Sequence, residues 1–462
     1  MSFSALDSST LDRLSDTLDG QLARPGDGDW DAARQAWQLA VDQQPVAVAH
    51  AASVRDVVAV VDTARALGLR VAPQATGHNA APLSPLGGTI LLKTSLLRSV
   101  QIDAAAHRAR AQAGALWCDV IGPAGEAGLA TLAGTAPKVG VVGYTLGGGL
   151  SWLSRKYGLA ANGVLAIELV TADGRHHRVD GECEPDLFWA LRGGGGSFGV
   201  VTALEFSLFP ISEVYAGALF WPIDAAHEVL HTWRQWTATV PEEVTSVGRL
   251  LRFPPLPDLP EHLRGRSFAA IEAACLTYDE RAAAELLAPL RALHPAMDTF
   301  GPTPVTELGA LHMDPDGPVP AFGDGMLVGA LPAAGIDAFL AVVGPGSDSP
   351  LLSAELRHLG GALEPGPAKY GAVSALDGAF AMFGVGITPD AGSAAAVRRS
   401  VEALYAAMVP WSAGRSYLNF AERPKAGPAL FGADTYRRLC EIKAAYDPTD
   451  LIRANHPVPP VG

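Results

Sequence analysis

The sequence predicts an α+β protein in which a glycine-rich domain is followed by a second domain of different composition and element pattern. A length of 462 residues favours two or three domains over one. Glycine clusters occur mainly before residue 213, and from there to about residue 410 proline loops, helices and single strands alternate. We therefore expect domains at 1–212 and 213–410, followed by a C-terminal segment at 411–462.

Composition and charge narrow the class of protein. Apolar residues make up 48% of the chain and charged residues 18%, which allows a large core. The net charge of −14 argues against nucleic acid or an anionic membrane as a partner, since both need a basic surface. The sequence shows no basic and apolar leader, no apolar run long enough to span a membrane and no cysteine spacing typical of a metal site. We expect a cytoplasmic protein with reduced thiols and no bound metal.

The first structural unit begins at residue 53. Ser53-Val-Arg-Asp56 is typical of a helix start, and Gly68 stands where a C-terminal cap belongs. A short strand is expected at 69–72, followed by a loop of small residues that contains His78. His78 is either a hydrogen-bonded structural residue or a nucleophile, and its small neighbours leave backbone N–H groups free to bind a pyrophosphate.

Two further glycine segments, 134–149 and 192–199, follow along the chain. Residues 194–199 fit the pattern G-x-G-x-x-G, but a predicted helix at 185–191 precedes them and a strand-like run follows. This order is the reverse of a dinucleotide-binding fingerprint and argues against a nicotinamide dehydrogenase. A strand at 166–172 with Asp173-Gly174 after it predicts a hairpin.

Near the C-terminus, Tyr417-Leu-Asn419 lies in a short apolar stretch before a predicted helix at 435–446. Alternation places Tyr417 and Asn419 on the same face of a strand. Tyr417 is either a half-buried core residue or a phenolic base, whose pKa of about 10 would have to be lowered for work near neutrality.

Taken together, these segments resemble the berberine bridge enzyme-like FAD-linked oxidoreductases of the vanillyl-alcohol oxidase superfamily. The resemblance implies a two-part FAD-binding domain of the p-cresol methylhydroxylase type and a substrate domain with an antiparallel sheet backed by helices. It also implies that 411–462 returns to the FAD-binding domain. Four stretches carry it: Gly77-His78, Val139–Gly149, Pro185–Thr202, and Tyr417-x-Asn419 with Tyr446-Asp-Pro448.

The resemblance implies FAD held covalently through His78. Many relatives form a second link through the cysteine of a Cys-Pro-Thr-Val-Gly run, but here the run is Ala136-Pro-Lys-Val-Gly140, so we expect a single link. The residues that it places against FAD, besides His78, are Gln74, Ala75, Thr76, Gly77, Asn79, Thr135, Ala136, Val139, Gly140, Gly143, Tyr144, Gly147, Gly199, Val200, Val201, Tyr417 and Asn419.

The implied activity is oxidation of a small or medium-sized alcohol, phenol, or polyketide- or alkaloid-like metabolite. Hydride would pass to flavin N5, and O2 would reoxidise the flavin to give H2O2. The candidate catalytic residues are Tyr417 as base, Tyr144 in reserve, and Glu355, which faces either the site or solvent. The alternatives are a flavin-dependent oxygenase or cyclase of secondary metabolism and a degenerate flavin-binding protein. The substrate and O2 are the expected partners, with the chain a monomer or homodimer.

Overall fold

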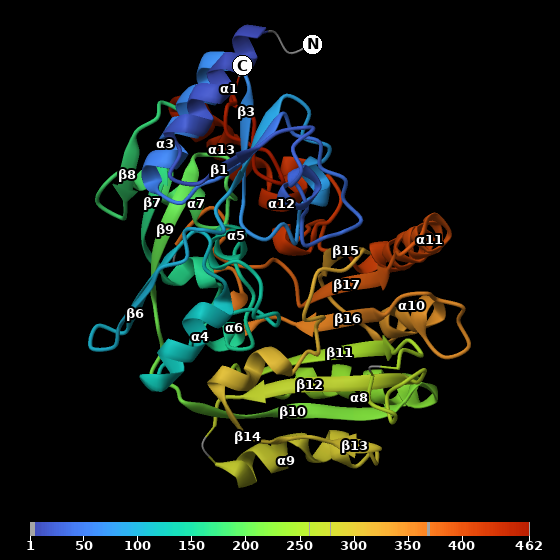
Figure 1. Cartoon of the computed structure of the whole chain (residues 1–462). Coiled ribbons are helices and arrows are strands. Elements are labelled where there is room, and N and C mark those ends of the chain that lie inside the picture. The colour runs from blue at the N-terminus through green and yellow to red at the C-terminus, as the bar shows by residue number, and fades with distance from the viewer. Residues whose placement is uncertain (1–4, 258, 278, 367–369, 462) are drawn as a thin grey trace.

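The computed structural model describes residues 5–257, 259–277, 279–366 and 370–461. Figure 1 shows a glycine-rich part that holds both chain ends and, below it, a broad sheet with helices on its outer side. The described residues form three sheets, of four, eight and five strands. The predicted α+β class is confirmed.

The four-stranded sheet has the order β1-β2-β4-β3, with parallel pairing among β2, β4 and β3 and antiparallel pairing of β1. The hydroxyl of Ser53 accepts the backbone N–H of Asp56 at the start of α3, and Gly68 ends the helix with φ +64°. Both predicted caps are therefore confirmed. The elements are α1 (Ala5–Thr17), β1 (Gln21–Ala23), α2 (Trp30–Ala33), β2 (Ala47–His50), α3 (Val54–Leu67), β3 (Arg70–Gln74) and β4 (Thr89–Lys93).

The five-stranded sheet is antiparallel throughout, with the order β5-β6-β9-β7-β8. Asp173-Gly174 forms the predicted hairpin between β7 and β8, with Gly174 at φ +83°. A helix, glycines and a strand follow in the predicted order at 185–207. The elements are β5 (Val100–Asp103), β6 (Arg108–Gln112), α4 (Trp117–Glu126), α5 (Val141–Leu146), α6 (Ser154–Tyr157), β7 (Val164–Val170), β8 (His176–Val179), α7 (Pro185–Leu191) and β9 (Val200–Ser207).

The eight-stranded sheet is also antiparallel. Four helices pack on its outer face and bury the largest apolar core, which confirms the expected sheet backed by helices (Figure 1). Its inner face meets the glycine-rich part through contacts such as Trp152 with Val247 and Ala274. The elements are β10 (Glu213–Pro222), α8 (Ala226–Thr237), β11 (Val244–Arg252), β12 (Ser267–Cys275), α9 (Glu280–Arg291), β13 (Met297–Asp298), β14 (Gly301–Pro304), β15 (Ala321–Val328), α10 (Ala333–Val343), β16 (Ser353–His358), β17 (Phe380–Ile387) and α11 (Ala391–Met408).

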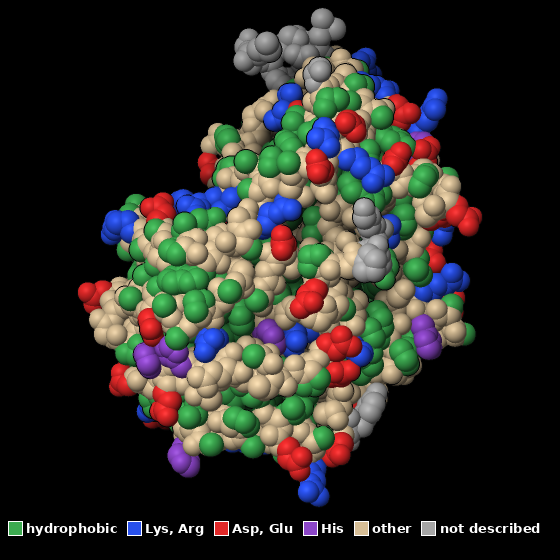
Figure 2. All heavy atoms as spheres, turned by 180° about the vertical axis from the view of Figure 1, so that it is seen from behind, with side chains coloured by type: hydrophobic (Ala, Val, Ile, Leu, Met, Phe, Trp, Pro, Cys, Tyr) green, Lys and Arg blue, Asp and Glu red, His purple; other side chains and the backbone are tan. Residues whose placement is uncertain are grey.

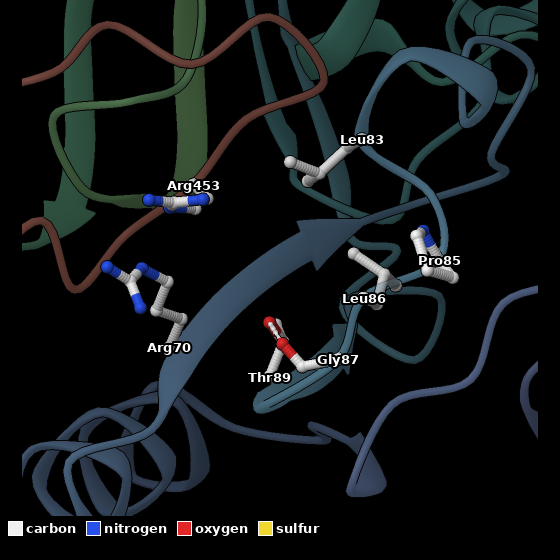
Figure 3. Close-up of a pocket in the computed structure, with 7 residues that line it drawn as sticks. All are labelled: Arg70, Leu83, Pro85, Leu86, Gly87, Thr89 and Arg453. Atoms are coloured by element: carbon white, nitrogen blue, oxygen red, sulfur yellow. Dashed lines mark hydrogen bonds between the residues drawn. The ribbon is translucent and has the colours of Figure 1, made fainter.

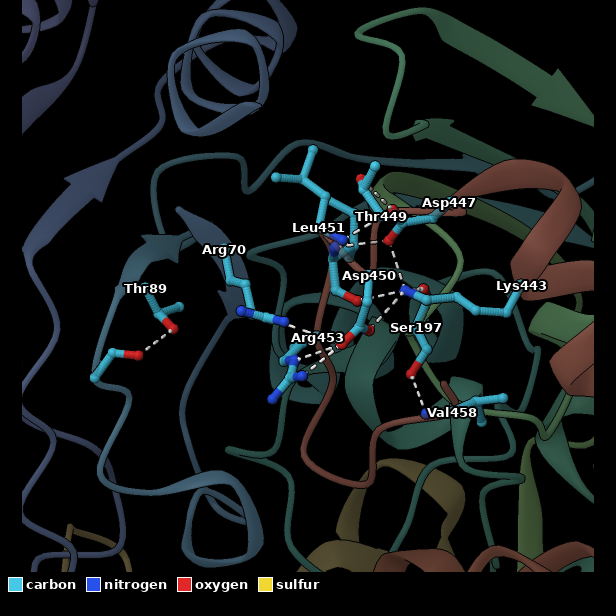
Figure 4. A network of polar contacts seen from close by, with 12 residues as sticks. Arg70, Thr89, Ser197, Lys443, Asp447, Thr449, Asp450, Leu451, Arg453 and Val458 are labelled. Carbon is cyan, nitrogen blue, oxygen red and sulfur yellow. Dashed lines mark hydrogen bonds and ion pairs between the residues drawn. The ribbon is translucent and has the colours of Figure 1, made fainter. Parts of the chain in front are cut away.

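The C-terminal segment returns to the two smaller sheets through α12 (Gly427–Phe431) and α13 (Ala433–Tyr446). Lys443 of α13 is fully buried, and its ammonium donates to the carbonyls of Ser197 and Ile452, each at 2.7 Å, and to the Asp447 carboxylate at 2.5 Å (Figure 4). The backbone N–H of Val71 in β3 donates to Leu451 at 2.8 Å. These contacts fasten the C-terminal segment to both sheets.

The surface mixes charges of both signs. Figure 2 shows acidic and basic side chains interspersed over one face of the molecule. All four cysteines are free thiols. Within the described ranges, none of the helices combines the length and the apolar character that crossing a bilayer requires.

Candidate functional site

The His78 loop begins at the C-terminal end of β3, whose last residue is Gln74. Gly77 has φ +82°, and a Cβ there would lie 2.8 Å from that of Ala36, so only glycine fits. The imidazole stacks on Trp37 with centroids 4.3 Å apart, and the Thr76 hydroxyl lies 2.7 Å from Nδ1. Burial lowers the pKa of His78 to about 4. The ring is therefore neutral at pH 7, as a nitrogen nucleophile must be.

A buried lysine supports the start of this loop. Lys93 lies at the end of β4, next to Gln74 in the register of the two strands. Its ammonium donates to the Gln74 side chain at 2.5 Å and to the Gln35 carbonyl at 2.8 Å. Burial lowers the pKa of Lys93 to about 8. The side chain places positive charge beside the loop expected to hold a pyrophosphate, although sequence reasoning did not single it out.

Asn79 joins the loop to the C-terminal segment. Its amide nitrogen donates to the Leu418 carbonyl at 3.3 Å. Its amide oxygen is buried, and no hydrogen-bond donor reaches it from the described residues. An unsatisfied buried oxygen at this position fits a polar cofactor that brings its own donor groups, as the hydroxyls and ring N–H of FAD do.

Tyr417 and Asn419 meet the second glycine segment. The Asn419 amide donates to the Tyr417 oxygen at 3.0 Å and to the Tyr144 carbonyl at 2.9 Å, and the Gly149 N–H donates to the Tyr417 oxygen at 3.0 Å. The expected strand at Tyr417–Asn419 is wrong, because residues 418–420 form a single 3-10 turn. The turn still brings the two side chains together, since the amide folds back onto the phenol.

The glycines of this segment make room for those side chains. A Cβ on Gly147 would lie 1.9 Å from the Asn419 amide oxygen. A Cβ on Gly149, which has φ +81°, would lie 2.5 Å from the Tyr144 ring. The close approach of Asn419 therefore depends on glycine at 147, and the seating of the Tyr144 ring depends on glycine at 149.

Burial favours the neutral form of both phenols. Burial raises the pKa of Tyr417 well above its ordinary value, although the Gly149 N–H, Asn419 and Arg357 lower it. Burial also raises the pKa of Tyr144, whose hydroxyl donates to the Leu132 carbonyl at 3.0 Å. A base at this position needs a lowered phenol pKa. Burial opposes that lowering, whereas the two N–H donors aimed at the Tyr417 oxygen favour it.

The inner face of the eight-stranded sheet carries a buried ionic network. The Arg249 guanidinium lies 2.7 Å from the Glu272 carboxylate, whose other oxygen lies 2.5 Å from His312 Nδ1. His312 Nε2 lies 2.9 Å from Glu355, which also accepts from Arg357 at 2.7 Å. Sequence reasoning found only Glu355 among these five residues.

Glu355 faces this network and not the solvent. Burial alone would raise the pKa of its carboxyl, but Arg357, His312 and Arg249 hold it well below its ordinary value. Arg357 lies over the Phe420 ring at 4.9 Å, and Phe420 packs against Tyr417 with centroids 5.1 Å apart. The network therefore reaches the phenol through two packed side chains.

A small cavity marks the space between the two parts of the molecule. Thr135 and Trp152 line it from the glycine-rich side, and Val247 and Arg357 line it from the sheet. A larger cavity of about 220 Å³, lined in part by Arg70, lies elsewhere (Figure 3). Arg70 begins β3, whereas the His78 loop follows the other end of that strand. The larger cavity is therefore separate from the site.

The other predicted residues are spread along the glycine-rich part. The Thr135 hydroxyl donates to Asp314 at 3.0 Å and so faces the sheet domain. Gly140 immediately precedes α5, and Gly143 and Tyr144 lie within that helix. Val200 and Val201 begin β9, and Gly199 immediately precedes it, where a Cβ on Gly199 would lie 2.6 Å from Leu169. That glycine is required for packing within the five-stranded sheet.

The comparisons agree with this geometry. Residues 45–180 match the FAD binding domain family, and residues 416–459 match the berberine and berberine-like family. The (R)-6-hydroxynicotine oxidase of Paenarthrobacter nicotinovorans is 36% identical over 44% of this chain and 45% of its own length. A FAD-dependent monooxygenase of Fusarium proliferatum is 38% identical over 39% of this chain and 35% of its own length. The matched segments thus span about half or less of these relatives.

Solved structures match over nearly the whole chain. The 6-hydroxy-D-nicotine oxidase of Arthrobacter nicotinovorans superposes with a TM-score of 0.83 at 25% identity, covering 95% of this chain and 97% of the other. A BBE-like protein of Physcomitrella patens gives 0.85 at 20% identity, covering 98% and 99%. Fold and site together define a flavoprotein with a FAD-binding domain of the p-cresol methylhydroxylase type. The chain therefore contains a FAD binding domain and a berberine-like C-terminal segment, and it is similar over nearly its whole length to berberine bridge enzyme-like FAD-linked oxidoreductases.

Proposed function

We propose that this protein is an oxidase of a small organic alcohol or phenol, with FAD linked covalently to His78 alone. The observation that carries the proposal is the contact between Asn79 and Leu418. It joins a loop with a neutral imidazole to a turn that places the Tyr417 phenol against the sheet domain, beside Leu327 and Ala381. FAD, when bound, supplies the two-electron acceptor and passes the electrons to O2, giving H2O2.

The chain's own residues hold the cofactor. The loop Gln74–Asn79, with Lys93 behind it, would bind the pyrophosphate, and the segment around Gly140 would complete that side. Thr76 orients the His78 ring through Nδ1. A neutral imidazole nitrogen of His78 would hold the flavin covalently at its 8α carbon, a two-electron oxidation for which O2 would be the oxidant. Ala136 has no thiol for a second link.

Tyr417 would accept the substrate's hydroxyl proton. The Gly149 N–H and the Asn419 amide both point at its oxygen and stabilise negative charge there. Tyr144, whose hydroxyl is already committed to Leu132, is the reserve candidate. Glu355 is paired on both of its oxygens and would shape the pocket through Arg357 instead of moving a proton itself.

The proposal is tested first by acid precipitation of purified protein, after which yellow colour should stay in the pellet and be absent from His78→Ala. A tryptic peptide containing His78 should carry the flavin mass. A panel of primary alcohols and phenols should then produce H2O2 in equal amount to the O2 consumed. Release of all pigment on denaturation, with His78 unmodified, would overturn the covalent assignment.

A monooxygenase is the second candidate, because the relatives include FAD-dependent monooxygenases as well as an oxidase. Labelled O2 separates the two, since only a monooxygenase places the label in its product. A degenerate flavin-binding protein is the third alternative. Rapid reoxidation in air after photoreduction would argue against it.

A further inference from the structure

Two histidines and an aspartate converge on the outer side of the sheet domain, away from the flavin site. His227 and His231 lie one turn apart in α8, which places both imidazoles on the same helix face. Asp337 lies in α10, which packs beside α8. Two separate helices therefore contribute to one cluster.

The ligand atoms of the three side chains lie close together. The Asp337 Oδ1 atom lies 2.8 Å from His231 Nε2 and 3.3 Å from His227 Nε2. The three ligand atoms all lie within 4.8 Å of one another, and the two imidazole centroids are 4.3 Å apart. Ligands about 2.0–2.1 Å from a tetrahedral zinc ion are themselves separated by about 3.3 Å. The observed spacing needs only small side-chain rotations to enclose an ion.

We propose that His227, His231 and Asp337 bind one divalent first-row transition ion such as Zn²⁺, Ni²⁺ or Cu²⁺. Two imidazoles and one carboxylate suit these metals, whereas Mg²⁺ and Ca²⁺ prefer oxygen ligands throughout. The His227 and Asp337 side chains are 72% and 54% exposed, so an ion reaches them from solvent and water completes its coordination. His231, at 18% exposure, forms the buried side of the site.

Such an ion would tie α8 to α10. Both helices contribute to the core on the outer face of the sheet, through Trp233 and Phe339 among others. The ligands are on the outer face, whereas the ionic network of Glu272 and Glu355 is on the inner face of the same sheet. Metal binding therefore stabilises the sheet domain and is independent of the flavin chemistry.

The test uses the full FAD-loaded chain, freed of metal by a chelator and desalted. Titration with ZnCl2, and separately with NiCl2, should show one saturable site by calorimetry and a rise in Tm. The variants H227A and H231A should each weaken the affinity at least about tenfold and reduce the rise in Tm at a fixed metal concentration. H294A, which removes an exposed histidine elsewhere, is the matched control and should bind as the wild type does.

Cobalt gives a second readout that does not depend on stability. Co²⁺ in a site with histidine ligands should produce a visible absorption band that H227A loses and H294A keeps. His227 is largely exposed, so its replacement leaves the fold intact. The proposal is overturned if the wild type shows no saturable binding, or if the variant with both H227A and H231A binds as tightly as the wild type.

Discussion

The side-chain amide of Asn419 donates a hydrogen bond of 3.0 Å to the phenol oxygen of Tyr417, two residues before it in the chain. The same oxygen accepts the backbone N–H of Gly149 at 3.0 Å. Two donors on one phenol oxygen favour its ionised form, against the burial that favours the neutral form. Proton transfer at Tyr417 therefore depends on both donors.

Replacing Tyr417 with phenylalanine should slow flavin reduction by about 10²-fold or more, because the proton acceptor is removed. Asn419→Ala should slow it by about tenfold, because one donor to the phenol oxygen is lost. Anaerobic stopped-flow absorbance measures both rates at saturating substrate. Tyr436→Phe, in α13 and outside the site, is the control. Unchanged reduction in Tyr417→Phe would remove this residue from the role of base.

Thr76→Val should slow attachment of FAD to His78, because the ring loses the hydroxyl that contacts Nδ1. Thr17→Val is the matched control, since that hydroxyl donates to the Arg13 carbonyl within α1 and is exposed. Refolding with FAD, followed by mass spectrometry over time, gives the rate. For the wild type the rate should be flat between pH 6 and 8, because the pKa of His78 is about 4 and the ring is already neutral there. A rate that climbs steeply through pH 6.5 would show that the imidazole is not desolvated.

Local signals in the sequence predicted much of the fold. Ser53 and Gly68 marked both ends of α3, and Asp173-Gly174 marked a hairpin, because caps and tight turns depend on a few adjacent residues. The prediction of a strand at Tyr417–Asn419 was wrong, because the local sequence there does not determine the structure. Alternation over three residues is too short to separate a strand from a 3-10 turn, and the C-terminal segment takes its shape from its contact with the second glycine segment.

The ionic network was harder to predict, because its members come from four separate parts of the chain. Glu272 interrupts an apolar strand, Ser267–Cys275, and a charge in such a run is a usable signal of a buried partner. His312 gave no comparable signal, since it lies in a loop and meets Glu272 and Glu355 only in the folded chain. Trp37 likewise reaches His78 only through tertiary packing.

Glu355→Gln should destabilise the fold by about 3–5 kcal/mol, because it leaves Arg357 buried without its carboxylate and leaves His312 with only one of its two, that of Glu272. Urea unfolding of the FAD-loaded protein measures the loss. Glu285→Gln is the control, since its pair with Arg281 is exposed and is expected to contribute less than about 1 kcal/mol. A loss for Glu355→Gln as small as that of the control would show that the network is solvated in solution.

Glu422 should make stability depend on pH. Burial raises the pKa of its carboxyl from 4.5 to about 7, with Asp324 adding to the rise and the Gly323 N–H opposing it. Because the folded state holds this proton more tightly than the unfolded state, the contribution to stability is complete below pH 4.5 and is lost as the pH rises through 7. The side chain in Glu422→Gln cannot ionise. Between pH 5 and pH 8, the free energy of unfolding of this variant should therefore rise relative to that of the wild type by up to about 3 kcal/mol. Urea unfolding at both pH values measures the change, and a constant difference between the two proteins would mean that Glu422 is ionised throughout.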